Sequence, residues 1–187
     1  MFKGNTASQQ GGVSRTANFL KFVNCVFDGN TSDYDGIAST DLTAESCTFY
    51  NNTASTLGDI SYATALDLKN CIFFGGSHKF DSETGRALYC DNVDGTNLGG
   101  LITVGCISGN PLFASTTYND PLYLRLALGS PCIDTGTFDA TVPTRDAAGN
   151  PRPAIPGSRV DMGAYEFQGT DVNPPIVQVI QPTGERY

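Results

Sequence analysis

The chain has 187 residues, which is enough for one medium-sized domain with its own hydrophobic core. With 16% charged residues, 40% hydrophobic residues and 21 glycines, its composition favours short strands joined by tight turns over long helices. The net charge of -8, without a lysine- or arginine-rich stripe, argues against nucleic acids and anionic membrane surfaces as partners.

A repeat fills the first part of the chain. Its most regular element is a phenylalanine followed by a turn that contains Gly or Asn, at Phe2–Thr6, Phe27–Thr31, Phe49–Thr53 and Phe73–Ser77. Each of the last three phenylalanines has a cysteine two residues before it. Because residues two apart share one face of a strand, we expect each cysteine and its phenylalanine to point inward together.

The length of the repeat predicts the fold. Each unit is too short for a strand–helix–strand crossover, and no helical periodicity is present. Successive phenylalanines are 22 to 25 residues apart, a repeat length found in leucine-rich repeats and in the parallel β-helix. The L-x-x-L-x-L pattern of leucine-rich repeats is absent. We therefore predict an all-β, right-handed, single-stranded parallel β-helix, a solenoid in which each coil stacks about 4.8 Å above the last.

Stacking would align equivalent residues in ladders. The sequence predicts ladders of cysteine (Cys25, Cys47 and Cys71), of phenylalanine (Phe2, Phe27, Phe49 and Phe73) and of asparagine (Asn5, Asn30 and Asn52). We expect the ladder cysteines to be buried free thiols, because stacked Cβ vectors run parallel, a poor geometry for a disulfide. We expect the asparagines in a turn, with their amides bonded to the next coil. A disulfide stays open among the remaining cysteines of the less regular half, Cys90, Cys106 and Cys132.

The regular register breaks after Gly76. Residues 77–101 predict a longer coil with a surface loop, and residues 101–107 predict one further coil.

Two later segments, 110–136 and 146–166, are punctuated by Pro, Gly and Asp. They resemble the C-terminal end of a widespread group of secreted bacterial right-handed β-helix proteins. The open edge of a strand stack must be covered, so we interpret these segments as an irregular C-terminal cap. Asp134 and Asp161 each precede a glycine by two residues and are expected to form turns within it.

The β-helix domain is predicted to span residues 1–168. Residues 169–187 read as a linker and the start of a following immunoglobulin-like module. The first residues begin in the middle of a repeat, so we expect a piece of a longer, modular, secreted protein, with any export signal upstream. No apolar run approaches the ~20 residues of a membrane span.

The sequence offers no visible catalytic set. Adjacent aspartate pairs are absent, no lysine lies beside an acidic cluster, and His78 is the single histidine. Carboxylates of different coils can still converge in space. Asp33 with Asp35, and Asp94 in the longer coil, offer the oxygen ligands that calcium prefers, although a solvated turn is the more common outcome. No other cofactor is predicted.

Sugar binding needs less than catalysis, namely aromatic faces and planar polar side chains. Since the chain has no tryptophan, tyrosine must supply the aromatic face. The predicted carbohydrate-binding residues are Tyr89, its neighbours Arg86, Asp91 and Asn97 in one groove, and Tyr118 and Tyr123, which flank a turn.

As a whole the chain resembles the β-helix type of carbohydrate-binding module found beside plant-cell-wall hydrolases such as xylanases. The resemblance implies a plant polysaccharide, xylan, as ligand, a covalently attached catalytic module, and secretion. Two rivals stay open: a polysaccharide lyase or glycosidase of β-helix fold, and a structural or adhesive stalk. An uncapped first coil would allow a monomer or a weak dimer.

Overall fold

The computed structural model describes residues 1–8, 19–33, 35–38, 41–55, 58–76, 80–92 and 101–169. This part of the chain is all-β, with strands and no helix. The strands are β1 (Phe2–Lys3), β2 (Thr6–Ala7), β3 (Leu20–Val23), β4 (Val26–Asp28), β5 (Thr31–Ser32), β6 (Asp35–Ala38), β7 (Leu42–Glu45), β8 (Thr48–Ala54), β9 (Gly58–Lys69), β10 (Ile72–Gly76), β11 (Phe80–Leu88) and β12 (Leu101–Val104).

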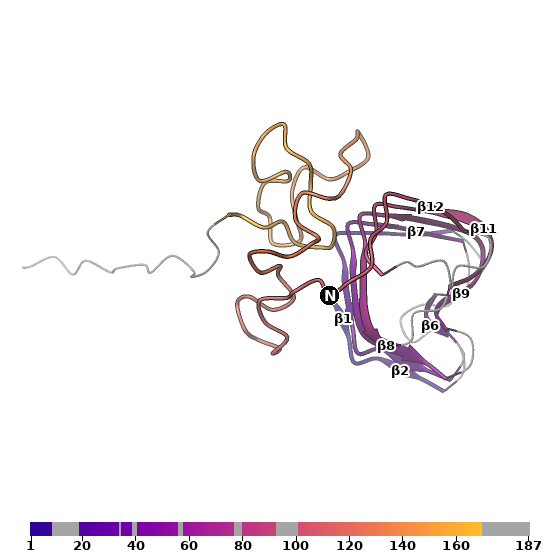
Figure 1. Ribbon diagram of the computed structural model, residues 1–187. Helices are drawn as coiled ribbons and strands as arrows, with labels where there is room; N and C mark the ends of the chain where they lie inside the picture. Colours follow the sequence, from indigo (N-terminus) through magenta and orange to yellow (C-terminus); the bar gives the residue numbers. More distant parts are fainter. Residues whose placement is uncertain are drawn as a thin grey trace, which may run out of the picture.

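The strands form two parallel sheets, and neither closes into a barrel. The first sheet holds β1, β2, β4, β5, β8 and β10, and the second holds β3, β6, β7, β9, β11 and β12. The chain passes from one sheet to the other and back, so equivalent strands of successive passes lie side by side (Figure 1).

The predicted phenylalanine ladder is confirmed. Phe27 pairs with Phe2 and with Phe49, and Phe49 pairs with Phe73. Neighbouring rings are stacked, with centroids 5.0, 4.7 and 4.5 Å apart along the ladder. These rings fill the space between the two sheets together with a leucine row from the second sheet, in which Leu42 and Leu66 are buried. The hydrophobic core is therefore built from equivalent residues of successive repeats, which stack on one another.

The cysteine ladder is longer than predicted. Cys25, Cys47 and Cys71 are free, as expected, and the ladder continues into Cys90 and Cys106. The amide N–H of Cys71 donates to the sulfur of Cys90 at 3.4 Å, and that of Cys90 to the sulfur of Cys106 at 3.5 Å. The disulfide left open for the second half does not form, because Cys90 and Cys106 occupy the same stacked position, and Cys132 is also a free thiol.

A left-handed corner precedes each ladder cysteine. The residue before it has a φ of about +50° to +65° in all five passes, at Asn24, Ser46, Asn70, Tyr89 and Gly105. Asn and Gly tolerate this conformation best, which explains their recurrence before the cysteine. The exceptions are Ser46 and Tyr89.

The asparagine ladder is confirmed as well. The Asn30 side chain accepts hydrogen bonds from the backbone and side chain of Asn5, at 3.1 and 2.8 Å. Asn52 accepts the equivalent bonds from Asn30 at 3.0 and 2.9 Å. The Asn52 amide donates in turn to the Phe27 carbonyl at 3.0 Å. The buried turn is thus satisfied entirely from coil to coil, as burial of polar groups demands.

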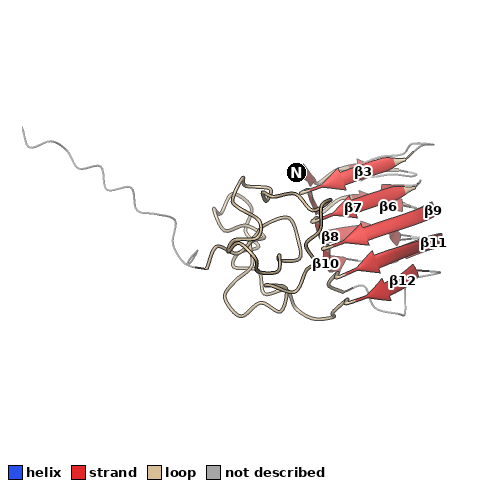
Figure 2. Ribbon diagram, turned by 90° about the horizontal axis from the view of Figure 1, so that it is seen from above, coloured by secondary structure: helices blue, strands red, loops and turns tan. Residues whose placement is uncertain are grey.

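The C-terminal segment, residues 107–169, contains turns and isolated β-bridges but no strand. It lies beside the first sheet rather than over the end of the stack (Figures 1 and 2). Val26 and Ile72 point away from the phenylalanine core and are buried against the C-terminal segment. Val26 lies beside Leu124, and Ile72 lies beside Met162. The expected position of the cap, over the end of the stack, is therefore wrong: the segment covers a lateral apolar face of the first sheet.

A buried charged cluster fastens this segment internally. The Arg152 side chain pairs with Glu166 at 3.3 Å and donates to the Gly163 carbonyl at 3.0 Å. Asp146 accepts the Glu166 amide N–H at 3.0 Å. Asp161 accepts the amide N–H groups of Asp134 and Phe167, so it joins distant parts of the segment rather than closing the local turn that its spacing to glycine predicts.

Candidate functional site

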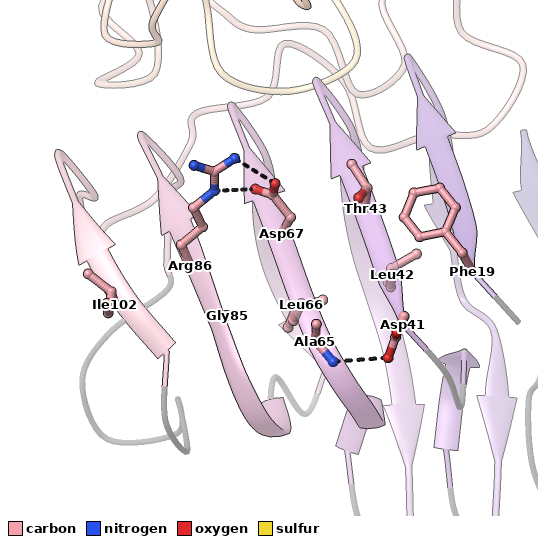
Figure 3. Close-up of a pocket in the computed structure, with 10 residues that line it drawn as sticks. All are labelled: Phe19, Asp41, Leu42, Thr43, Ala65, Leu66, Asp67, Gly85, Arg86 and Ile102. Atoms are coloured by element: carbon pink, nitrogen blue, oxygen red, sulfur yellow. Dashed lines mark hydrogen bonds and ion pairs between the residues drawn. The ribbon is translucent and has the colours of Figure 1, made fainter.

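A groove crosses the outer face of the second sheet (Figure 3). Strand pairing aligns Lys21 with Thr43, Thr43 with Asp67, Asp67 with Arg86, and Arg86 with Ile102. Because strands in a sheet are about 4.8 Å apart, this row of five residues is roughly 19 Å long and runs along the stack. The hollow beside it has a volume of about 360 Å³, and its lining residues are Phe19, Asp41, Leu42, Thr43, Ala65, Leu66, Asp67, Gly85, Arg86 and Ile102.

A bidentate ion pair lies in the middle of the groove. The Arg86 guanidinium donates through Nε and Nη2 to the two carboxylate oxygens of Asp67, at 3.0 and 2.8 Å. These hydrogen bonds raise the pKa of Arg86, which therefore stays charged. Both side chains are partly open to solvent, at 54% and 37% exposure. The pair thus offers a fixed, planar polar surface, because each partner holds the orientation of the other.

Apolar side chains stand at the two ends of the groove. Phe19 lies next to the first strand of the row and is 62% exposed. Ile102 lies on the last strand and is 69% exposed. Both side chains line the groove and can add apolar contacts to a ligand that spans its polar centre.

A second carboxylate lies on the floor of the groove. Asp41 accepts the backbone N–H of Ala65 at 3.0 Å, which fixes its side chain across two strands. Gly85 is nearby, with φ +153°, and a Cβ there would lie 2.1 Å from the Leu66 carbonyl oxygen. Only glycine fits at this point of β11, so the backbone path that carries Arg86 depends on it.

The residues of the predicted groove do not come together. Arg86 lies in the groove just described. Tyr89 lies at a left-handed corner, half-buried, with the Arg159 guanidinium 5.1 Å from its ring centre and Gly105 below the ring. Asp91 is fully buried under the C-terminal segment, where the Cys132 thiol donates to it at 3.4 Å. Asn97 lies outside the described residues.

Tyr118 and Tyr123 do lie together, at a separate place beside the first sheet. Their rings meet edge to face with centroids 5.6 Å apart. Tyr118 is 51% exposed, whereas Tyr123 is buried and its hydroxyl donates to Asp28. Tyr123 therefore has a structural contact that the sequence did not predict.

The calcium candidates remain a prediction. Asp33 is an exposed turn residue, the backbone of Asp35 opens β6, and Asp94 and the single histidine, His78, lie outside the described residues. Within the described part of the chain, no three His, Cys, Asp or Glu side chains gather as a metal ion would require.

Sequence reasoning missed most of the groove, namely Phe19, Asp41, Thr43, Asp67 and Ile102. A signal was available for one of them. Asp67 and the predicted Arg86 occupy equivalent positions, directly before the inward residues Leu68 and Ala87, but they are 19 residues apart rather than 22 to 25. Because this repeat is shorter than the others, a fixed spacing did not predict that Asp67 and Arg86 pair.

Comparison with known proteins gave no matching family model, no similar curated protein and no similar solved structure. Among the residues that the structure describes, none forms a helix long and apolar enough to cross a membrane. The resemblance to carbohydrate-binding β-helix modules therefore enters below as a proposal.

Proposed function

We propose that this chain is a right-handed parallel β-helix that acts as a non-catalytic carbohydrate-binding module. Its ligand is a plant-cell-wall polysaccharide, xylan in the first place, bound along the outer face of the second sheet. In this proposal the parent protein is secreted, and the module holds an attached glycoside hydrolase near its polymer, which raises the effective concentration of substrate.

The observation that carries the proposal is the elongated groove centred on Arg86 and Asp67. Its long axis follows the stack, so an extended chain of sugar rings would lie across successive strands, over the central ion pair and between the apolar residues at the two ends. A guanidinium–carboxylate pair offers donors and acceptors to hydroxyl groups, and Phe19 offers a flat apolar face to a sugar ring.

One observation favours the rival reading as a glycosidase. Asp41 and Asp67 are two carboxylates of neighbouring strands that line the same groove, and glycoside hydrolysis uses a pair of carboxyl groups. Both, however, accept hydrogen bonds from N–H donors, Asp41 from Ala65 and Asp67 from Arg86. A general acid must instead donate a proton to the leaving oxygen, and both oxygens of Asp67 already accept from Arg86. Asp67 is thus held as part of a polar surface, and we favour binding without cleavage.

The test is native affinity electrophoresis of the purified chain in gels that contain xylan, other plant glycans or no glycan. We expect xylan to retard the wild-type chain. Arg86→Ala and Phe19→Ala should each abolish most of the retardation, since each removes one half of the groove's chemistry. Phe138→Ala is the matched control, because Phe138 is 48% exposed but does not line the groove.

A reducing-sugar assay on every retarding glycan separates binding from cleavage. No product release is expected. Product release that disappears in Asp41→Asn and Asp67→Asn would replace the proposal with the glycosidase reading. Absence of retardation by any glycan would instead favour a structural stalk.

A further inference from the structure

A second cavity, of about 270 Å³, lies in the C-terminal segment beside the first sheet. Three tyrosines of this segment line it, Tyr118, Tyr123 and Tyr165, together with Arg125 and the turn that carries Asn119 and Asp120. None of these residues contributes to the groove on the second sheet. We call it the tyrosine cavity.

One wall of the tyrosine cavity is held from the first sheet. The Tyr123 hydroxyl donates to the buried carboxylate of Asp28, which also pairs with Lys3. The Lys3 ammonium lies 4.7 Å from the centre of the Tyr118 ring, and that ring meets Tyr123 edge to face. Tyr118 is thus oriented by two partners while half of its side chain stays exposed to solvent.

The opposite wall is fixed within the C-terminal segment. The Arg125 guanidinium lies 5.0 Å from the centre of the half-buried Tyr165 ring, and its Nε donates to the Pro121 carbonyl at 3.2 Å. Asp120 accepts the backbone N–H of Leu122 at 2.8 Å. These contacts fix the polar lining before any ligand arrives, which lowers the entropic cost of binding.

We propose that the tyrosine cavity binds one sugar ring, a chain end or a branch of the same polysaccharide. Aromatic faces beside a planar guanidinium, a carboxylate and an amide are the chemistry that holds a sugar ring. The volume of about 270 Å³ leaves room for a single sugar ring beside Tyr118. The inference rests on the proposed function, because it assigns the cavity to a carbohydrate ligand.

The test uses saturation-transfer-difference NMR on the full chain with D-xylose, L-arabinose and D-glucose as separate probes. We expect transfer to at least one of the three. Tyr118→Ala should weaken its binding about tenfold or more, since the exposed stacking face is lost, and Tyr118→Phe should restore it. Phe138→Ala should leave it unchanged, because Phe138 lines neither the cavity nor the groove.

Gel retardation by xylan distinguishes failure of this inference from failure of the proposed function. If xylan retards the chain in an Arg86-dependent way while no single sugar gives transfer, the tyrosine cavity is not a sugar site and the groove proposal survives. Transfer that persists unchanged in Tyr118→Ala overturns the inference as well. Circular dichroism of each variant checks that the fold is retained.

Discussion

The hydroxyl of Tyr123 donates a hydrogen bond to the carboxylate of Asp28, a residue 95 positions earlier in the chain. The contact joins the C-terminal segment to strand β4 of the first sheet. Both side chains are buried, and burial raises the pKa of Tyr123 to about 12, so the phenol keeps its proton. The segment that covers the stack is thereby fastened to it by a polar contact as well as by apolar packing.

Removal of this hydroxyl should loosen the segment. Tyr123→Phe leaves a buried carboxylate with one donor fewer, which we expect to cost about 1–3 kcal/mol in the free energy of unfolding. Urea denaturation followed by circular dichroism measures it. Tyr118→Phe is the control, because Tyr118 is half exposed, and a change below about 0.5 kcal/mol is expected. Equal effects of the two variants would contradict the role given to Tyr123.

The charged cluster around Arg152 should make stability depend on pH. Burial, and then the charge of neighbouring carboxylates, raises the pKa of Glu166 to about 7, and burial raises that of Asp161 to about 6. Both values lie above the ordinary 4.5 and 3.8, so the folded chain binds more protons than the unfolded chain between about pH 4 and 7. Stability should therefore fall as pH rises through this window, by an amount on the order of 2 kcal/mol from Glu166.

Glu166→Gln tests this directly. The variant also loses its ion pair with Arg152, so the slope of stability against pH, rather than its absolute value, is the readout. We expect a flatter slope than in the wild-type chain between pH 5 and about 7. Asp134, Asp146 and Asp161 also face this cluster and are present in both proteins, so their effects largely cancel in the comparison. Parallel slopes would show that Glu166 does not carry the raised pKa.

The two ends of the cysteine ladder should differ in reactivity. Cys25 and Cys106 are both half-buried, but the hydrogen bond with Cys90 lowers the pKa of Cys106 to about 7. The hydrogen bond with Cys47, together with burial, raises the pKa of Cys25. Because the thiolate is the nucleophile, iodoacetamide at about pH 7.5 should label Cys106 well before Cys25. Peptide mass spectrometry over time measures both rates.

The same experiment contains its own controls. Cys47, Cys71 and Cys90 are fully buried and should be labelled only after unfolding in urea. Labelling of Cys25 as fast as Cys106 would show that exposure alone sets reactivity, and not the position in the ladder.

The phenylalanine ladder should dominate the stability of the stack. Phe49 is fully buried between Phe27 and Phe73, so Phe49→Ala removes two stacked contacts and leaves a cavity, at a cost of about 3–5 kcal/mol. Phe2 lies on the first strand, is half-buried, stacks on Phe27 and meets Phe22 edge to face, so Phe2→Ala should cost roughly half as much. Urea unfolding of both variants checks the ratio, and a Phe2 variant as unstable as the Phe49 variant would contradict the ladder argument.

The sequence by itself determined the repeat and which residues stack on one another. In-register pairing places each residue on its counterpart one pass away, so the Phe27, Asn30 and Cys47 positions are readable from spacing alone. The same reasoning stopped at Cys90 and Cys106, because the passes there shorten and a fixed spacing no longer identifies the stacked position.

Only the tertiary structure decided what covers the outward face of each sheet. Outward residues of the first sheet, such as Ile72, read as surface positions, yet the C-terminal segment buries them, and Asp91 with them. In the second sheet the outward residues Asp67 and Arg86 stay open and pair with each other. The outward residues Glu45 and Lys69 are instead buried where Thr141 packs on them. Strand parity fixes the side on which a residue lies, but burial depends on which distant segment packs there, and that contact has no local pattern in the chain.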